Sequence, residues 1–286
     1  MRHLKIFVEL TRLNKPIGFM LLFWPCSWGL AYALFFNQNI NTFLYYLLLF
    51  FLGSVLMRSA GCIFNDIVDR DFDKKVERTK KRPLAAGIIS VKHSFIYVII
   101  LCLSALVILL QFNLFTIILG MSSMVLAFSY PFMKRITYWP QLFLGITFNW
   151  GIIMAWAAVN NSINIEILIL YLSAIFWTLG YDTIYGAQDM SDDEIIGLKS
   201  TSIKFKKNIG LFVSFSYFIS TILLFFAFKN FIGMNFFSFF LFLYFLSLVY
   251  QLLKLRKNNS KNYLSLFKFN NYSGLILFVG IYSINL

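Results

Sequence analysis

The sequence predicts an all-α integral membrane protein with about nine transmembrane helices. Of its 286 residues, 59% are hydrophobic, 20% are aromatic and only 13% are charged, and the mean hydropathy is +0.75. A soluble domain of this length cannot bury so much apolar surface, so lipid has to be the solvent for most of it. The three cysteines lie in apolar stretches without metal-binding spacing, which disfavours disulfides and a zinc site. We expect residues 1–286 to form a single transmembrane domain.

Nine charge-poor runs are each long enough to cross a hydrocarbon core of about 30 Å. They cover residues 17–36, 43–65, 93–111, 114–131, 139–159, 166–187, 209–228, 231–253 and 270–286. The loops between them alternate between basic and neutral, as expected for helices that cross the membrane in turn.

Positive charge sets the predicted orientation. All but two of the 25 Lys and Arg residues lie in the N-terminal segment or in the loops that follow the second, fourth, sixth and eighth runs. The exceptions are Arg58, inside the second run, and Lys229, on the opposite side. Cytoplasmic loops are enriched in Lys and Arg, so we expect the N-terminus and these loops to be cytoplasmic. The net charge of +13 is then a signal of topology, and nucleic acid is not expected as a partner.

The acidic residues form two clusters at the same end of the predicted bundle. Ten of the twelve Asp and Glu residues lie in Asp66–Glu77 and Asp182–Glu194, where the second and sixth runs end. In the first cluster, three aspartates at helical spacing share one face: Asp66, Asp69 and Asp73. In the second cluster, three more share a face if the helix continues: Asp182, Asp189 and Asp193, with Tyr185 nearby.

Like charges stacked on one helical face are destabilising, and more so at a membrane boundary. A divalent cation relieves this cost, and Mg²⁺ prefers a few carboxylates together with water and substrate phosphate oxygens. The two clusters therefore predict a site for magnesium and a diphosphate, although ordinary polar loops rich in acid are the alternative. Asp71 falls on the far side of the first helix, where we expect a solvated residue paired with nearby lysines.

Basic and phenolic side chains near the clusters are the candidates for binding the diphosphate. Arginine can hold phosphate oxygens with two hydrogen bonds, and lysine supplies a compact positive charge. The candidates are Arg78, Arg82, Tyr130, Lys134, Tyr185 and Lys199. The alternative for each basic residue taken singly is that it serves only to fix the topology.

At these residues the chain resembles the UbiA superfamily of intramembrane prenyltransferases. The matching segments are R-L-N-K-P-I-G (12–18), R-S-A-G-C-I-F-N-D-I-V-D-R-D-F-D (58–73), R-T-K-K-R-P-L-A-A-G (78–87), Y-P-F-M-K-R (130–135), Y-D-T-I-Y (181–185) and G-L-K-S-T (197–201). They follow the family's order over about residues 10–205, and N-D-x-x-D-x-x-x-D followed by D-x-x-x-D is specific to the superfamily. One departure is Lys206, where the family pattern often has a small residue, and residues 206–286 carry no motif.

The resemblance implies nine transmembrane helices around a central cavity that opens laterally to lipid, with Mg²⁺ as the cofactor. It assigns the metal and diphosphate site to Asn65, Asp66, Asp69, Asp73, Asp189 and Asp193. It assigns direct contacts with the diphosphate to Arg78, Arg82, Tyr130 and Lys134. Arg12 matches an N-terminal arginine expected to meet the carboxylate of the acceptor.

The segments that flank the aspartates resemble the branch that acts on 4-hydroxybenzoate. This implies transfer of a polyprenyl group from polyprenyl diphosphate to the carbon ortho to the hydroxyl, an early step of ubiquinone biosynthesis. The setting it implies is a bacterial inner membrane with a cytoplasmic active site, lipid as the surroundings and no obligatory protein partner. Alternatives are another acceptor, such as a naphthoate, homogentisate or haem, or an ion-coupled transporter. A transporter is disfavoured because transporter sites lie near the midplane of the membrane, whereas both acidic clusters lie at the cytoplasmic ends of the predicted helices.

Overall fold

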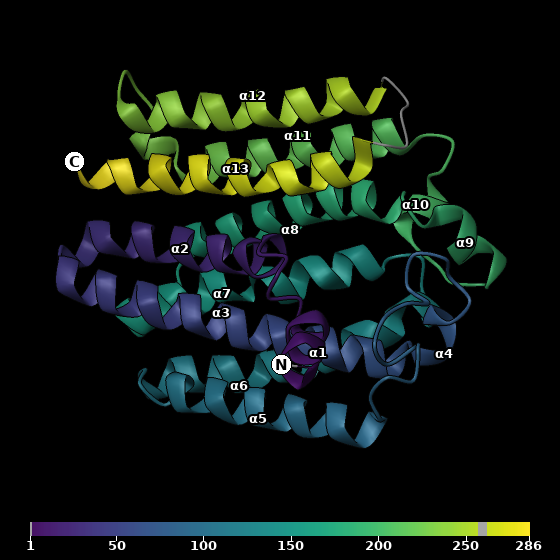
Figure 1. The fold of residues 1–286 in the computed structure, drawn as a ribbon. Coiled ribbons are helices and arrows are strands. Elements are labelled where there is room, and N and C mark those ends of the chain that lie inside the picture. Colours follow the sequence, from purple (N-terminus) through teal and green to yellow (C-terminus); the bar gives the residue numbers. More distant parts are fainter. Residues whose placement is uncertain (1, 257–261) are drawn as a thin grey trace.

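The computed structural model of the chain describes residues 2–256 and 262–286, which form helices joined by loops (Figure 1). Nine helices of this described part are long and apolar enough to cross a membrane, as predicted. They are α2 (Ile17–Asn37), α3 (Ile40–Val68), α5 (Val91–Leu109), α6 (Leu114–Ile136), α7 (Pro140–Asn160), α8 (Ile165–Gly186), α11 (Ile209–Ala227), α12 (Phe236–Arg256) and α13 (Tyr263–Tyr282). The short helices are α1 (Arg2–Thr11), α4 (Arg70–Asp73), α9 (Met190–Ile195), α10 (Thr201–Lys204), η1 (Lys229–Phe231) and η3 (Ser283–Asn285).

The last two spans differ most from the predicted ranges. Helix α12 begins at Phe236, after the short turn η1, and not at residue 231. Helix α13 begins at Tyr263 and not at residue 270. Its first turns contain Lys268 and Asn270, which lower the local hydropathy although Asn270 is fully buried inside the bundle. Lys257 and Lys261, part of the last basic loop, lie outside the described residues.

Helix α1 was not expected from the hydropathy because it is too short and too polar to cross a membrane. It has one apolar face, which packs against α3 and the start of α5. Leu10 on that face is fully buried, and the ring of Phe7 meets Tyr97 with centroids 5.2 Å apart. This packing places the residues that follow α1 beside the carboxyl end of α3.

Polar side chains cap the amino ends of four of the long helices. Asn39, Asn113 and Asn164 each accept a hydrogen bond from a backbone amide in the first turn of α3, α6 and α8, and Ser90 does the same for α5. Such caps satisfy amides that have no partner within the helix. The three asparagines lie in neutral loops, where they let the chain turn back into the membrane within a few residues.

Helices α2 and α7 approach closely in one half of the bundle. A Cβ added to Gly29 of α2 would lie 2.6 Å from the carbonyl oxygen of Ile152, and one added to Gly151 of α7 would lie 2.3 Å from Cys26 Sγ. These glycines let the two backbones pack against each other. The short helices α4, α9 and α10 gather at the other end of the bundle (Figure 1), and there α2 and α7 leave room for a cavity.

Hydrogen bonds between buried side chains join α8 and the three C-terminal spans. Asn270 of α13 accepts from Trp177 Nε1 at 2.9 Å and donates to Gln251 Oε1 at 2.9 Å. The hydroxyl of Tyr217 donates to the same Gln251 oxygen at 2.9 Å. Interhelical hydrogen bonds of this kind stabilise helix packing in lipid. They explain how residues 206–286, which carry no motif, support α8 and its aspartate.

Candidate active site

A cavity of about 1640 Å³ opens among α2, α3, α5, α6, α7, α8 and α13 and reaches the loops around α4 and α9. It is lined by the six predicted aspartates, Asp66, Asp69, Asp73, Asp182, Asp189 and Asp193. Arg12, Asn65, Arg78, Arg82, Tyr130, Lys134, Tyr185 and Lys199 line it as well. The structure thus brings all the predicted site residues to one chamber, whose walls farther into the bundle are mainly apolar.

The first three aspartates lie where α3 gives way to α4. Helix α3 ends at Val68, and Asp69 turns the backbone with φ −93° and ψ 2° before α4 begins. Asp66, Asp69 and Asp73 are nevertheless buried together, with 2%, 1% and 7% of their surface exposed. The predicted shared face therefore survives the break in the helix. Burial of three carboxylates requires counter-charges.

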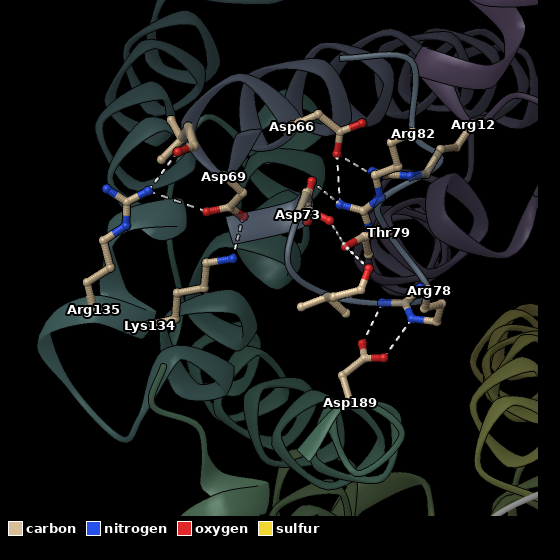
Figure 2. Close-up of polar contacts among 12 residues, drawn as sticks. Arg12, Asp66, Asp69, Asp73, Arg78, Thr79, Arg82, Lys134, Arg135 and Asp189 are labelled. Carbon is tan, nitrogen blue, oxygen red and sulfur yellow. Dashed lines mark hydrogen bonds and ion pairs between the residues drawn. The ribbon is translucent and has the colours of Figure 1, made fainter. Parts of the chain in front are cut away.

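Arginines from two separate segments neutralise Asp66 and Asp73 (Figure 2). Arg12, just after α1, places Nη2 2.6 Å from Asp66 Oδ1. Arg82, in the loop after α4, places Nη1 3.1 Å from the same oxygen and 2.8 Å from Asp73 Oδ2. Thr79 helps to fix this loop because its hydroxyl donates to the backbone carbonyl of Asp73 at 3.0 Å.

Asp69 faces the carboxyl end of α6. Lys134 Nζ forms an ion pair with Asp69 Oδ2, and Arg135 Nη2 lies 3.5 Å from Oδ1 while donating to the carbonyl of Val68 at 2.7 Å. That second carboxylate oxygen, Asp69 Oδ1, is buried without a hydrogen-bond partner. It has the longer ion pair with Arg135 but no hydrogen bond, so it keeps acceptor capacity for a ligand.

The second cluster does not continue one helix, so the condition for a shared face is not met. Helix α8 ends at Gly186, and Asp189 directly precedes α9. A Cβ at Gly186 would lie 2.7 Å from Ser202 Oγ, so this end of α8 packs closely against α10 and the chain turns. Asp182 remains in α8, apart from Asp189 and from Asp193 on α9.

Asp189 pairs across the chamber with the loop after α4 (Figure 2). Arg78 donates from Nε to Asp189 Oδ1 at 2.7 Å and from Nη2 to Oδ2 at 2.5 Å. This two-bond geometry is strong and specific. The guanidinium of Arg78 also lies 5.8 Å from the ring centroid of Tyr185. The pair joins the two aspartate clusters, which belong to loops 111 residues apart.

Burial shifts the titration of two carboxyl groups outside the spans. Burial raises the pKa of Asp73 above its ordinary value, against the opposing attraction of Arg82. Burial together with the nearby Asp189 carboxylate raises the pKa of Asp193 to about 6. Both shifts mark carboxylates with less counter-charge than their burial requires.

The remaining candidates occupy different parts of the chamber. Lys199 directs Nζ to the carbonyl of Ile136 at 3.2 Å and not to a carboxylate. Tyr185 stacks on Phe267 of α13 with centroids 4.4 Å apart. Asn65 is half-buried at the end of α3. None of these contacts tests the predicted roles of the three residues in binding metal or diphosphate, so those roles stay predictions.

The sequence reasoning gave no role to Arg58, a cation inside the span α3. Its Nε is buried without a hydrogen-bond partner, and its guanidinium carbon lies 5.3 Å from the ring centroid of Phe148. Gly18 of α2 leaves room for it, since a Cβ there would lie 2.8 Å from that Nε. The available signal was its position, because an isolated charge within an apolar span usually marks a functional site. No role was expected for Arg135 either, although it is adjacent to the predicted Lys134 and lies 3.5 Å from Asp69 Oδ1.

The donor set at this site suits a hard divalent cation. Among residues 2–256 and 262–286, no three acidic, His or Cys side chains are gathered closely enough to hold a metal by themselves. Four of the carboxylates instead pair with Arg or Lys, while Asp69 Oδ1 has no hydrogen-bond partner. Mg²⁺ needs only one or two carboxylates when water and phosphate oxygens complete its shell. The residues present therefore fit magnesium that arrives with a phosphorylated ligand.

Fold and site together define a multi-span membrane protein with one large cavity, which is lined by carboxylates at one end and by apolar side chains deeper in the bundle. The chain belongs to the UbiA prenyltransferase family, whose model matches residues 22–272.

Named relatives in animals are mitochondrial proteins. The 4-hydroxybenzoate polyprenyltransferase of Rattus norvegicus is 48% identical over 214 residues, which cover 74% of this chain and 57% of the rat protein. That of Bos taurus is 43% identical over 282 residues, which cover 98% of this chain and 75% of the bovine protein. The chain thus spans little more than half the length of its rat relative.

Solved structures with the same fold include two archaeal proteins. The apo structure of a UbiA homolog from Aeropyrum pernix K1 matches with a TM-score of 0.77 at 22% identity, over 93% of this chain and 98% of that one. A UbiA homolog from Archaeoglobus fulgidus bound to GPP and Mg²⁺ matches with a TM-score of 0.73 at 18% identity, over 98% and 100%. At these identities the similarity establishes the fold.

Replacing Arg82 by methionine tests the buried ion pairs. The substitution removes the cation that Asp66 and Asp73 share, and breaking a buried pair costs about 3–5 kcal/mol. We expect the free energy of unfolding in detergent to fall by about 3 kcal/mol. The control is Lys80→Met, whose pair with Glu77 has side chains 44% and 78% exposed, so its loss should lower that free energy far less. Equal losses in the two variants would contradict the role given to Arg82.

Proposed function

We propose that this protein transfers a polyprenyl group from polyprenyl diphosphate to the carbon ortho to the hydroxyl of 4-hydroxybenzoate, acting as one domain. The observation that carries the proposal is the pairing of two aspartate clusters with cations at the mouth of an apolar cavity. Family membership and the names of the animal relatives support it. The products are 3-polyprenyl-4-hydroxybenzoate, diphosphate and a proton, and the reaction is a step of ubiquinone biosynthesis.

Magnesium is the proposed cofactor, held by Asp66, Asp69, Asp73, Asp189 and Asp193 with the amide oxygen of Asn65. When bound, Mg²⁺ neutralises charge on the diphosphate and stabilises it as a leaving group. The UbiA homolog of Archaeoglobus fulgidus was solved with GPP and Mg²⁺, which supports a divalent cation in the fold. Four of these carboxylates are paired with Arg or Lys and would have to exchange partners to bind it, whereas Asp193 forms no ion pair within the described residues.

The basic residues have the complementary task. Arg78, Arg82 and Lys134 would exchange their carboxylate partners for oxygens of the diphosphate as the carboxylates take up metal. They then stabilise the negative charge that grows on the leaving group while the allylic C–O bond breaks. The same side chains thus pair with carboxylates before the substrate arrives and bind the substrate afterwards. We propose the same diphosphate-binding role for Tyr130, Tyr185 and Lys199 at the edge of the chamber.

The ring carbon of the acceptor forms the new C–C bond with the allylic carbon, and the ring then loses a proton. Asp182 and Asp193 both line the cavity and form no ion pair within the described residues. Because Asp193 is proposed to hold the metal, Asp182 is the carboxylate left to accept that proton. The apolar walls exclude water, which would otherwise capture the allylic cation and give the alcohol.

The acceptor's carboxylate needs a cation of its own in a chamber that already holds a diphosphate and several aspartates. Arg12, expected for this role from the sequence, is held by Asp66 at 2.6 Å. Arg58 also lines the cavity, and its buried Nε lacks a hydrogen-bond partner. We propose that Arg58 and Arg12 both meet the acceptor, with Arg58 the principal contact.

The basic loops favour the cytoplasmic face of a bacterial inner membrane as the position of the chamber. The named relatives are mitochondrial, so the bacterial setting and the orientation are proposals for this chain. Its multi-span membrane character follows from the nine long apolar helices of the described residues.

An assay of membranes with 4-hydroxybenzoate and a long-chain polyprenyl diphosphate tests the function directly. We expect 3-polyprenyl-4-hydroxybenzoate to form with magnesium and not when the metal is chelated. Asp69→Asn should lower turnover by about 100-fold or more, since it weakens electrostatic stabilisation of the leaving group. The matched control is Asp71→Asn, because Asp71 is 83% exposed and paired with Lys74, and this variant should keep normal turnover. Wild-type activity in Asp69→Asn at limiting magnesium would overturn the metal assignment.

Arg58→Met tests the acceptor contact. Losing a charge-assisted hydrogen bond costs about 1.5–3 kcal/mol, which corresponds to a rise of roughly ten- to a hundredfold in the apparent KM for 4-hydroxybenzoate. The KM for polyprenyl diphosphate should stay nearly unchanged. Arg12→Ala should raise both values because it also frees Asp66. An unchanged acceptor KM in Arg58→Met would leave Arg58 without a role in binding.

A further inference from the structure

Helix α9 carries Asp193 and directly follows Asp189, but it has no buried side chain with which to anchor itself. The structure describes all six of its residues, Met190–Ile195, and none of them is buried. Ile195 is 83% exposed. Helix α8, which could have continued to these aspartates, already ends at Gly186. Short helices are unstable without tertiary packing, so the position of the second aspartate cluster must be fixed by the chain next to α9.

The segment that follows α9, residues 198–202, is by contrast mostly buried. We call it the strap. Leu198 and Ser200 are buried, and Thr201 and Ser202 are completely so. Three of its five residues carry hydroxyl groups, and polar side chains taken out of water need hydrogen-bond partners. The strap therefore has to be held by specific polar contacts.

Thr201 contacts both α7 and α8. Its backbone amide donates to Oε1 of Gln141, at the start of α7, at 2.9 Å. Its hydroxyl lies 2.7 Å from the hydroxyl of Thr183 on α8. The Thr183 hydroxyl donates its own hydrogen to the carbonyl of Leu179 at 2.6 Å. Because a hydroxyl group has one hydrogen, Thr201 must be the donor between the two threonines.

A glycine at the end of α8 leaves room for these contacts. A Cβ at Gly186 would lie 2.7 Å from Ser202 Oγ and 3.2 Å from Gln141 Nε2. Ser202 can therefore donate to the carbonyl of Thr183 at 2.8 Å, and Gln141 stays close to the strap. Side chains of α7, α8 and the strap thus form one buried set of hydrogen bonds beside the second aspartate cluster.

The backbone of the strap connects the two aspartate clusters. The amide of Leu198 donates to the carbonyl of Asp193 at 2.9 Å, and the amide of Lys199 donates to the carbonyl of Lys134 at 2.8 Å. Lys134, at the end of α6, forms the ion pair with Asp69 of the first cluster. A displacement of the strap would therefore move Asp193 relative to Asp69.

We propose that Thr201 and Gln141 are positioning residues for prenyl transfer, because the strap that they hold sets the distance between the two aspartate clusters. The inference rests on the proposed function for the ligand that both clusters bind. Thr201 does not line the cavity within the described residues, and the Gln141 oxygen is directed to the strap, so both act through the aspartates. Groups that orient metal-binding side chains in this way tune the affinity for the metal.

The first experiment measures the distance between the clusters without any ligand. Spin labels are attached through Lys74→Cys, just after α4, and Ser191→Cys, on α9, in a protein without its native cysteines and in lipid nanodiscs. Both positions are exposed. Double electron–electron resonance should give one narrow distance distribution for this parent and for Thr201→Ser, which keeps the hydroxyl. It should give a broad or shifted distribution for Thr201→Val, which has the same shape without the hydroxyl. The parent's narrow distribution in Thr201→Val, or a broad one already in the parent, would contradict the proposal.

The second experiment separates positioning from a contribution to stability alone. Loss of a group that orients metal ligands costs roughly 10- to 100-fold in metal affinity or activity. We expect Thr201→Val to raise the apparent KM for polyprenyl diphosphate and the half-saturating magnesium concentration by about tenfold. The KM for 4-hydroxybenzoate should stay nearly unchanged, and Thr201→Ser should behave as the wild type. A variant that is only less stable would yield less active protein with unaltered KM values. That result, or equal rises in the KM of both substrates, would refute the positioning role.

Thr116→Val is the matched control. Thr116 is also fully buried, its hydroxyl has no hydrogen-bond partner within the described residues, and it lies on α6 outside the cavity lining. This variant loses a hydroxyl but no hydrogen bond, so both KM values should stay as in the wild type.

Gln141→Leu is an independent variant for the case in which Thr201→Val does not fold. It removes the acceptor of the Thr201 amide and should reproduce the rise in the donor KM and the broader distance distribution. Wild-type values of both in Gln141→Leu would count against the proposal. A strap variant that broadens the distance, in a protein whose wild type forms no 3-polyprenyl-4-hydroxybenzoate, would instead reject the proposed function and leave the role of the strap intact.

Discussion

Burial of carboxylates at the edge of a membrane is the constraint on which the rest of this structure depends. Asp66, Asp69 and Asp73 are at least nine-tenths buried, and charges without partners in such a place are very costly. Each one contacts a cation supplied from elsewhere in the chain, by the segment after α1, the loop after α4 or the end of α6. The ion pairs therefore add to the hydrophobic packing that already holds these elements together. They also form a site that a metal and a diphosphate can enter by exchanging partners.

The nine membrane spans and the end of the bundle that carries the charged residues could be predicted from the sequence, because a segment in contact with lipid must be long, apolar and nearly free of charge. Helix ends that depend on tertiary packing could not. The turn after α8 separates Asp182 from Asp189, and it follows from the close fit of Gly186 against Ser202. The early start of α13 depends on Asn270, a polar residue that is favourable in the membrane only because Gln251 and Trp177 bond to it.

The acidic residues of the candidate site could be predicted from the sequence, but the pairing of each acid with its basic partner could not. Aspartates at helical spacing are rare in so apolar a chain, and their motif resembles one family. Which cation meets which carboxylate depends on distant contacts, such as that of Arg12 with Asp66 or of Arg78 with Asp189. Arg58 was visible in the sequence as an isolated charge within a span, but its unpaired position in the cavity wall emerges only from the packing of α2 beside it.

The central claim is that the carboxylates bind the diphosphate through metal and do so only by giving up their cations. Calorimetric titration of a non-reactive polyprenyl diphosphate analogue into the purified protein, with magnesium and with chelator, tests it most directly. Several kcal/mol of metal-mediated attraction predict binding about 100-fold tighter or more with magnesium. Equal affinity under the two conditions would contradict the claim, since the arginines and lysines alone would then hold the diphosphate.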